Sequence, residues 1–467
     1  MQTFSILLCM DGMQNVPDEV KHYIEQLEKE NRLLKDSLHQ LHRQVHRLQE
    51  RITELEKRLK IHENPHTPPS MQRFKENTNG TNPPGKRGAP PGHYGATRII
   101  PEPDEVIPVT MEQCPRCGSY LGQAIDIESR IIEELPPPQK IKVTQYDLHK
   151  YVCPGCGCTV TAAHQDCPKV GNLGIRLMTQ ITMAKYHQRG VLRRIQESLW
   201  DQYRFSISPK GIHDVLLRVG GACAGEYKQL KQRIRLAQWR YTDETSIPVL
   251  GRNWWLWISR THSDDVLVTI RPSRGQKVLK EILGEEVIGA DVTDGWRSYH
   301  WLPRVQRCWA HLLREVDDFK EPLEHEQELS EEMHRRYNLL KEFLGKDPPM
   351  EERVQQKELW DKELQEVVNE NLQYLDVRVK AQYIQNGFGC WYTCLLYPGM
   401  HPTNNLAEQV IREHVIIRKI IGTFRSEKGS ENYQYIASLL ATWKLQGKNM
   451  SEELESLLRR ELCFSQS

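Results

Sequence analysis

The sequence has no long hydrophobic run, no recognisable export signal and almost no net charge. No stretch of about 18 apolar residues occurs, so we expect no membrane-spanning helix. The apolar segment at residues 4–10 is short and has no basic flank, which makes it a poor signal peptide. The formal net charge is +1 over 467 residues, so any polyanion site must be local. We expect a cytoplasmic protein without membrane contact.

Cysteine, by contrast, is well represented, with 12 residues. Without an export signal this favours reduced thiols and metal ligands over disulfides. Four of them form two CxxC pairs, each followed by Gly: Cys114, Cys117, Cys153 and Cys156. Four thiolates suit a tetrahedral Zn²⁺ and leave no open position for chemistry, so the predicted zinc is structural.

The zinc-binding segment is predicted over residues 110–167 as a small zinc ribbon. The residues between the two pairs, such as Ile131-Ile132 and Ile141–Val143, suit a hairpin. Cys158 and Cys167 are spare thiols that remain alternatives to Cys156 as a ligand.

Residues 18–61 carry a heptad repeat. Apolar residues alternate at spacings of three and four, which is the a/d seam of a coiled coil: Ile24, Leu27, Leu34, Leu38, Leu41, Val45, Leu48, Ile52, Leu55 and Leu59. Asn31 takes one a position, where Asn fixes the register and favours a parallel dimer. We predict a homodimer or larger assembly through this leucine zipper. A long helix packed within its own chain is the alternative.

Residues 62–98 are rich in Pro, Gly, Asn and Thr and carry several basic residues. This composition predicts a disordered basic linker, which acts either as a spacer or as a contact to DNA phosphates.

Residues 168–237 have helical periodicity and a local excess of positive charge. Between Lys185 and Arg240 there are twelve Lys or Arg residues and four Asp or Glu residues. Ser208 before Pro209 marks a helix start, so two helices meet at a break, as in a helix-turn-helix. We predict a DNA-binding region here. Its candidate contacts are Arg193, Arg194 and Lys210; a solvated helix pair is the alternative.

The periodicity changes over residues 238–445. Strands are predicted at 238–250, 254–258, 266–270, 287–293 and 305–308, and helices at 275–283, 296–301 and 310–319. The order strand-strand-strand-helix-strand-helix-strand-helix is that of a ribonuclease-H-like core, so the fold class is α/β. A charged helical stretch, 328–344 and 351–384 around a Pro348-Pro349 break, predicts a helical insertion at about 320–388. Residues 446–467 are predicted as a C-terminal helix.

In this order three acidic residues converge: Asp243 on the first strand, Asp294 at the end of the fourth, and Glu408 on a late helix that Thr403 or Asn404 caps. Three carboxylates can hold two Mg²⁺ (or Mn²⁺) ions for in-line displacement at a phosphodiester, with Asp243 bridging both. Two other acids compete with this set. Strand side chains alternate between faces, so only one acid of each pair can face the site, and Asp294 is preferred because Gly295 after it marks the strand end. Glu244 neighbours Asp243, and Asp291 lies three residues before Asp294.

Other polar residues lie close to these acids in the sequence. Cys308 and His311 have the spacing of a metal pair, but two further ligands are missing nearby, so a structural hydrogen bond or a supporting role near Asp294 is favoured. Basic residues after Glu408 are candidates for gripping DNA phosphates, with solvated exposure as the alternative: Arg412, Arg418 and Lys419.

The chain resembles transposases of the insertion-sequence-66 family from about Val20 to Leu445. The matching motifs are CPRCG, CPGCG, YTDET, TDGWRSY, CWAHLLREV and TNNLAEQVIREHVIIRK. The resemblance implies a zipper, a basic linker, a four-cysteine zinc segment and a DDE catalytic domain that acts on DNA with Mg²⁺. It implies Asp243, Asp294 and Glu408 as the catalytic set. The chain departs from the family pattern at Leu313, Gln409 and Glu413, and we expect weaker contacts to DNA near Gln409 and Glu413.

The predicted function is therefore a DNA transposase that cleaves and joins strands at the ends of an insertion sequence, nucleoid-associated in the cytoplasm and aided by companion proteins of the same element. A catalytically inactive, zinc-containing dimeric regulator derived from a transposase is the alternative from another class. A structure-specific nuclease or junction resolvase on the same core is a third reading, which the zipper, zinc segment and insertion disfavour.

Overall fold

The computed structural model describes residues 102–319 and 323–463, together with seven residues of the N-terminal region. The chain divides into two units, residues 1–99 and 100–467. The seven N-terminal residues are all helical and fall inside the predicted coiled coil: Tyr23, Gln26, Leu27, Lys29, Asn31, Gln49 and Arg51. The rest of the coiled coil and the linker at 62–98 lie outside the described residues.

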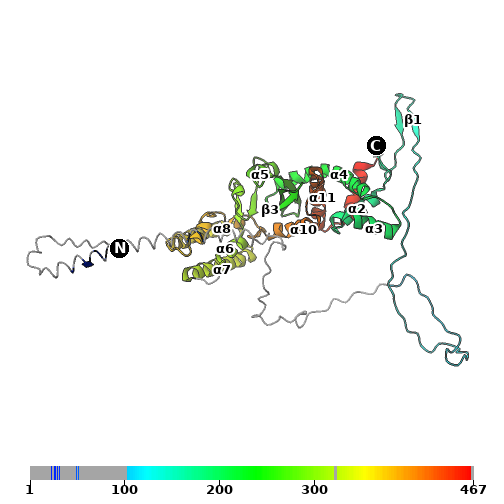
Figure 1. The fold of residues 1–467 in the computed structure, drawn as a ribbon, viewed down its shortest axis with the longest axis horizontal. Coiled ribbons are helices and arrows are strands. Elements are labelled where there is room, and N and C mark those ends of the chain that lie inside the picture. Colours follow the sequence, from blue (N-terminus) through cyan, green and yellow to red (C-terminus); the bar gives the residue numbers. More distant parts are fainter. Residues whose placement is uncertain are drawn as a thin grey trace, which may run out of the picture. The chain divides into compact units, whose positions relative to one another are not determined.

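The second unit is a mixed α/β structure (Figure 1). Its strands are β1 (Lys150–Val152), β2 (Thr159–Thr161), β3 (Trp239–Val249), β4 (Arg252–Thr261), β5 (Val266–Arg271), β6 (Ala290–Thr293) and β7 (Val305–Arg307). Its helices are α2 (Ile175–Tyr186), α3 (Leu192–Tyr203), α4 (Pro209–Leu236), α5 (Gln276–Leu283), α6 (Trp309–Val316), α7 (Glu324–Gly345), α8 (Met350–Asn371), α9 (Arg378–Gln385), α10 (Asn405–Ile421), α11 (Glu427–Leu445) and α12 (Met450–Leu462). Two 3₁₀ turns, η2 (Arg297–Tyr299) and η3 (Thr393–Leu396), complete the set.

The central sheet has five strands in the order β5-β4-β3-β6-β7. β3, β4 and β5 are antiparallel neighbours, while β6 and β7 run parallel to β3. The carboxyl ends of β3, β6 and β7 therefore meet at one edge of the sheet, where ligand sites of open α/β sheets form. This mixed sheet with its helices is compatible with the predicted ribonuclease-H-like core.

Alternation along the strands gives the sheet two apolar faces. On one face Tyr241, Ile258 and Val292 pack against α6, α10 and the insertion helices. On the other face Trp257 and Leu267 pack against α2, α4, α5, α11 and α12. Helices α2 to α4 thus share a core with the sheet, so the boundary expected near residue 237 does not separate two hydrophobic cores.

Helix α11 covers the free edge of β5. Thr442, Ser438 and Gln434 accept hydrogen bonds from the amides of Val266, Val268 and Ile270, at 2.9, 2.8 and 3.0 Å. The acceptors are spaced by four along the helix, and the donors by two along the strand, so one helix face serves one strand edge. These bonds satisfy an edge that would otherwise be open to pairing with another chain.

The expected helix starts are confirmed in part. Ser208 caps α4 by accepting a hydrogen bond from the Gly211 amide at 3.0 Å, with Pro209 in the first turn. Pro349 is the residue before α8, as the proline break predicts. Asn404 occupies the cap position of α10, but its side chain makes no cap hydrogen bond.

Several element boundaries differ from the sequence-based expectation. The fourth strand begins at Ala290 rather than 287, and residues 296–301 form only the 3₁₀ turn η2. The stretch 351–384 is two helices, α8 and α9, instead of one. The hairpin expected around 131–143 is absent from the described residues: the paired strands are β1 and β2, which flank the second CxxC pair. Ile132 and Val143 are exposed, so no core holds them in a hairpin.

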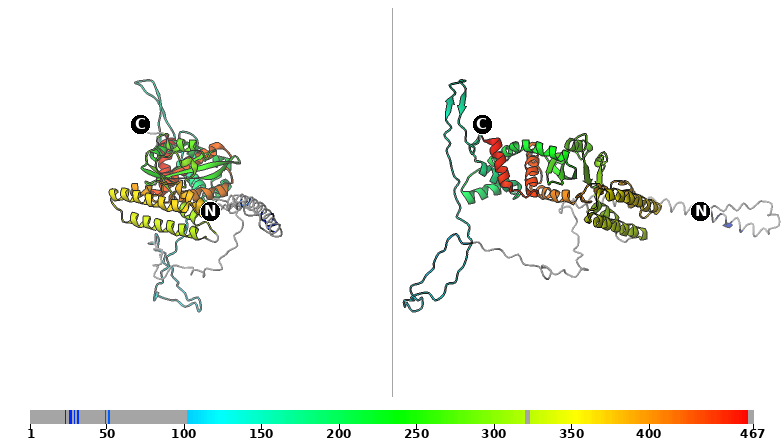
Figure 2. Two further views of the ribbon diagram at one scale, coloured as in Figure 1. Left: turned by 90° about the vertical axis from the view of Figure 1, so that its left-hand side faces the viewer. Right: turned by 180° about the vertical axis from the view of Figure 1, so that it is seen from behind.

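The insertion helices α7 and α8, yellow in Figure 2, lie side by side. Phe343 of α7 stacks edge-on against Trp360 of α8 with ring centroids 5.5 Å apart, and Arg336 donates to Glu363 at 3.2 Å. Their apolar residues join the core on the α10 face of the sheet. Within the part of the chain that the structure describes, no helix has the length and apolar character needed to cross a membrane.

Candidate active site at the carboxyl ends of the parallel strands

Asp243 lies on β3, and Asp294 directly follows the adjacent parallel strand β6. The β3–β6 register pairs Trp239 with Ala290 and Tyr241 with Val292. Continued by two residues, the same register places Asp294 beside Asp243. Neighbouring strands are about 4.8 Å apart, so both carboxylates start from backbones close enough to share a metal centre.

Glu408 approaches from the first turn of α10, which packs on the same face of β3. Arg314 of α6 donates to its carboxylate at 3.3 Å, and His311 Nε2 lies 3.9 Å away. The Glu408 side chain is 18% exposed, so it is accessible from solvent. Helices α6 and α10 therefore meet at this carboxylate.

The electrostatics of Asp243 link all three acids. Burial raises the pKa of Asp243 well above its usual value, and the negative charges of Glu244, Asp294 and Glu408 raise it further. The Asp243 carboxylate accepts a hydrogen bond from the Glu244 amide at 2.8 Å, and among the described residues it has no ion-pair partner. Asp243 is thus a buried carboxyl close to other acids and, in the described part of the chain, without a cationic partner, which favours binding of a cation.

The two competing acids are engaged elsewhere. Glu244 lies on the opposite face of β3, where Arg274 donates to it at 2.6 Å and the Tyr299 hydroxyl also donates. Asp291 is fully buried and forms a bidentate pair with Arg240, at 2.7 and 2.9 Å. Each therefore has a cationic partner, which Asp243 lacks.

Cys308 and His311 flank the start of α6. The Cys308 sulfur accepts a hydrogen bond from the Asn404 amide at 3.1 Å, and its own amide donates to the Thr293 carbonyl at 2.9 Å. Burial raises the pKa of this thiol, so it is neutral at physiological pH. The contacts fit the structural hydrogen bond favoured from the sequence.

The donor set fits Mg²⁺ or Mn²⁺, because carboxylate oxygens are the ligands that these hard ions prefer. Among the described residues, no group of three or more acidic, His or Cys side chains is gathered closely enough to enclose a metal. In two-metal sites each ion takes only one or two carboxylates, and water and substrate phosphate fill the remaining positions. Carboxylates that do not enclose the metal leave coordination positions for other ligands, so this arrangement suits an ion that binds together with DNA.

The two CxxC turns have matching backbones. The amides of Gly118 and Gly157 each donate to the carbonyl of the first cysteine at 2.8 Å, and both glycines have positive φ, 75° and 71°. The pKa of Cys117 is lowered chiefly by its hydrogen bond with Ser119, and that of Cys156 by the Cys158 backbone. Each turn brings its own pair of thiols together and fits half of a tetrahedral zinc site. No larger group of ligands forms in the described residues.

The candidate DNA-binding residues divide by exposure. Arg193, Arg412 and Lys419 are exposed, while Arg194 and Lys210 are exposed but paired with Glu197 and Asp214. Arg418 was expected to grip DNA, but it is 8% exposed and donates to the Ser246 hydroxyl at 2.9 Å. Through this contact Arg418 ties α10 to β3.

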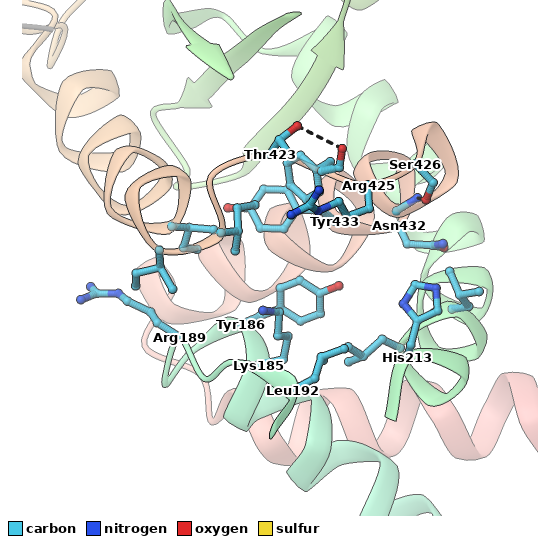
Figure 3. A pocket seen from close by; sticks show the side chains of 17 residues that line it. Lys185, Tyr186, Arg189, Leu192, His213, Thr423, Arg425, Ser426, Asn432 and Tyr433 are labelled. Carbon is cyan, nitrogen blue, oxygen red and sulfur yellow. Dashed lines mark hydrogen bonds between the residues drawn. The ribbon is translucent and has the colours of Figure 1, made fainter. Parts of the chain in front are cut away.

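A cavity of about 190 Å³, lined by none of the three acids, lies between α2, the start of α3, α4, α10 and α11. Tyr186 and Tyr433 face each other in it, with ring centroids 5.7 Å apart, and basic side chains such as Lys185 and Arg425 lie at its margin (Figure 3). None of its lining residues is acidic. Sequence periodicity could not reveal it, because its walls are formed by five helices and two connecting segments that lie far apart in the chain.

Two residues that contact the acids or the strand next to them were not predicted from the sequence. Arg274 neutralises Glu244 beside the site, and Asn404 donates through Nδ2 to the Thr242 carbonyl at 3.1 Å. Asn404 was visible as a helix start, but its spatial partner on β3 is 162 positions away.

A mixed sheet that carries acidic residues at the carboxyl ends of parallel strands, preceded in the chain by two CxxC turns, is compatible with a transposase. Comparison with protein-family models agrees. Residues 171–432 match the model described as "Transposase IS66 family", and residues 112–157 match the "zinc-finger binding domain of transposase IS66". The chain therefore belongs to the IS66 family of transposases. A comparison with curated proteins gives no match.

Proposed function

We propose that this chain catalyses metal-dependent cleavage and transfer of DNA strands at the ends of an insertion sequence, with Asp243, Asp294 and Glu408 as the catalytic acids. The observation that carries the proposal is the placement of the three acids: Asp243 on β3, Asp294 after the parallel neighbour β6, and Glu408 in the first turn of α10, which packs on β3. Family membership supports the class of reaction.

Asp243 would contact two Mg²⁺ ions, and Asp294 and Glu408 would each hold one. When bound, such a pair of ions stabilises both the attacking and the leaving oxygen of an in-line displacement at phosphorus. The chain's own contribution is to hold three carboxylates on rigid elements, two on the sheet and one on α10. Arg314, which pairs with Glu408 in this structure, would be free to turn to a DNA phosphate once a metal takes the carboxylate.

The exposed cations on α10 supply the most direct support for DNA contact beside the acids. Arg412 lies one turn beyond Glu408 and Lys419 two turns further, both in solvent. They would bind phosphates without reading sequence. We also propose that the chain dimerises through its coiled coil and acts with companion proteins of the same element.

The first test is the cleavage reaction itself. Purified protein is incubated with labelled duplexes that carry the terminal repeats flanking its gene, in Mg²⁺, in Ca²⁺ or with EDTA. We expect strand nicks at the repeat ends in Mg²⁺ and none with EDTA. Retention of DNA in a gel-shift assay without any nicking in Mg²⁺ or Mn²⁺ would contradict catalysis and favour the regulator.

The zinc proposal assigns Cys114, Cys117, Cys153 and Cys156 to one structural ion. We expect one Zn²⁺ per chain by elemental analysis, falling to below about one tenth in Cys114→Ser and in Cys153→Ser, because three remaining ligands hold the ion far less tightly.

The spare thiols provide the matched controls for this measurement. Cys158→Ser and Cys167→Ser keep all four proposed ligands and should retain a full equivalent of zinc. A loss of zinc in Cys158→Ser, with none in Cys156→Ser, would replace Cys156 by Cys158 in the site.

A further inference from the structure

The three proposed catalytic acids lie on three elements that the sheet alone does not hold together. β3 and β6 are hydrogen-bonded neighbours, but α10 follows them by more than a hundred residues and the whole insertion. Something must fix the distance from α10 to both strands, because a misplacement of about 1 Å at a reacting centre can cost roughly 10²-fold in rate.

Asn404 makes the connection from α10 to β3. Its Nδ2 donates to the carbonyl of Thr242 at 3.1 Å, and Thr242 immediately precedes Asp243. The Asn404 carbonyl accepts a hydrogen bond from the Glu408 amide at 3.1 Å. One residue thus contacts the backbone next to one acid and the backbone of another.

Cys308 extends the connection to β6. Its sulfur accepts from the Asn404 amide at 3.1 Å, and its amide donates to the carbonyl of Thr293 at 2.9 Å. Thr293 immediately precedes Asp294. Both bridging residues are buried, Asn404 at 0% and Cys308 at 1% exposure, so water does not compete for these bonds.

We propose that Asn404 and Cys308 form a positioning bridge that sets the spacing of Asp243, Asp294 and Glu408 and hence the affinity of the site for its metal ions. The inference rests on the proposed function and adds two residues to it that touch neither metal nor DNA. Three of its bonds end on an acid or on the residue directly before one, and the fourth joins Asn404 to Cys308, which distinguishes the bridge from ordinary core packing.

The side-chain chemistry suits this role. A primary amide donates to a strand carbonyl, which a carboxylate in the same place could not do. A neutral thiol is a weak acceptor that tolerates burial better than a hydroxyl. Supporting residues of this kind typically cost 10- to 100-fold in metal affinity or activity when they are replaced.

The test uses Asn404→Ala and Cys308→Ala in the full-length protein, with Cys223→Ala as the matched control. Cys223 is equally buried, at 0% exposure, and lies on α4 away from the acids. Mn²⁺ affinity is measured by electron paramagnetic resonance in the presence of terminal-repeat DNA, and the Mg²⁺ dependence of cleavage is measured in parallel. Thermal unfolding reports on stability.

We expect the two bridge variants to need at least about ten times more metal for half-saturation, with unchanged affinity for DNA in EDTA. Cys223→Ala should lower the unfolding temperature to a similar extent and keep the wild-type metal dependence. Cys308→Ser restores an acceptor and should recover part of the metal affinity, and it replaces the alanine variant if that one does not fold.

Wild-type metal affinity in both bridge variants, or an equal loss in Cys223→Ala, would overturn the inference. A different result would refute the proposed function. If the wild type binds Mn²⁺ but cuts no DNA, catalysis is refuted while the binding data still decide whether the bridge sets the site.

Discussion

Replacing Asp243 with Asn is expected to lower the rate of Mg²⁺-dependent DNA cleavage by about 10³-fold or more while leaving the chain folded. Asparagine keeps the shape of the side chain and the oxygen that accepts from the Glu244 amide, so the local backbone of β3 is preserved. It removes the charge and one metal-binding oxygen, so the residue can no longer bridge two cations.

Asp294→Asn and Glu408→Gln should have effects of the same order. The three acids act as one metal-binding unit, so double variants are expected to be hardly worse than single ones. Asp265→Asn is the control: Asp265 is also buried, at 5% exposure, but it pairs with Arg233 away from the site. Single-turnover cleavage of an intact, end-labelled terminal-repeat duplex measures the rates. Equal cleavage by wild type and Asp243→Asn would remove Asp243 from the mechanism.

Asp291→Ala is expected to destabilise the protein by about 3–5 kcal/mol, although this residue lies only three positions from Asp294. The substitution leaves the Arg240 guanidinium buried at 0% exposure without its carboxylate partner. Asp291 also accepts a hydrogen bond from Thr242 at 3.1 Å, so the loss reaches the strand that carries Asp243.

Urea unfolding of Asp291→Ala and Asp294→Asn distinguishes an acid that stabilises the fold from an acid that is proposed to act in catalysis. Asp291→Ala should strongly lower the urea concentration at the midpoint of unfolding. Asp294→Asn should lower it little, because the Asp294 carboxylate accepts a hydrogen bond from the Trp296 amide at an exposed turn. Asp264→Ala removes a partly exposed pair with Arg260 and should cost at most about 1 kcal/mol. An unchanged midpoint in Asp291→Ala would show that Arg240 finds another partner.

The order of the core elements was predictable, because alternation and strand-ending glycines are local signals. Gly295 shows why the strand end is fixed: it has φ of 89°, and a Cβ there would meet the Arg307 guanidinium at 2.3 Å. Alternation placed Asp291 and Asp294 on opposite faces, and the choice of Asp294 followed from Gly295, which marks the strand end; the buried Arg240–Asp291 pair is consistent with that choice.

Long-range pairings were not predictable. Arg418 was placed among DNA-binding residues because it lies in a basic run, yet its partner Ser246 is 172 positions away. The bridge of Asn404 and Cys308 depends in the same way on the meeting of α6, α10 and two strands. In the zinc segment the CxxCG turns were readable from sequence, but the hairpin between them was wrong, because Ile132 and Val143 have no core to pack on.

The most direct test of the account is the position of bound Mn²⁺ in crystals of the protein with its terminal-repeat DNA, read from anomalous scattering. The account predicts two peaks about 3.5–4 Å apart, ligated by Asp243, Asp294 and Glu408 and by phosphate oxygens. Manganese bound elsewhere on the chain, with these three carboxylates contacting no metal, would contradict it.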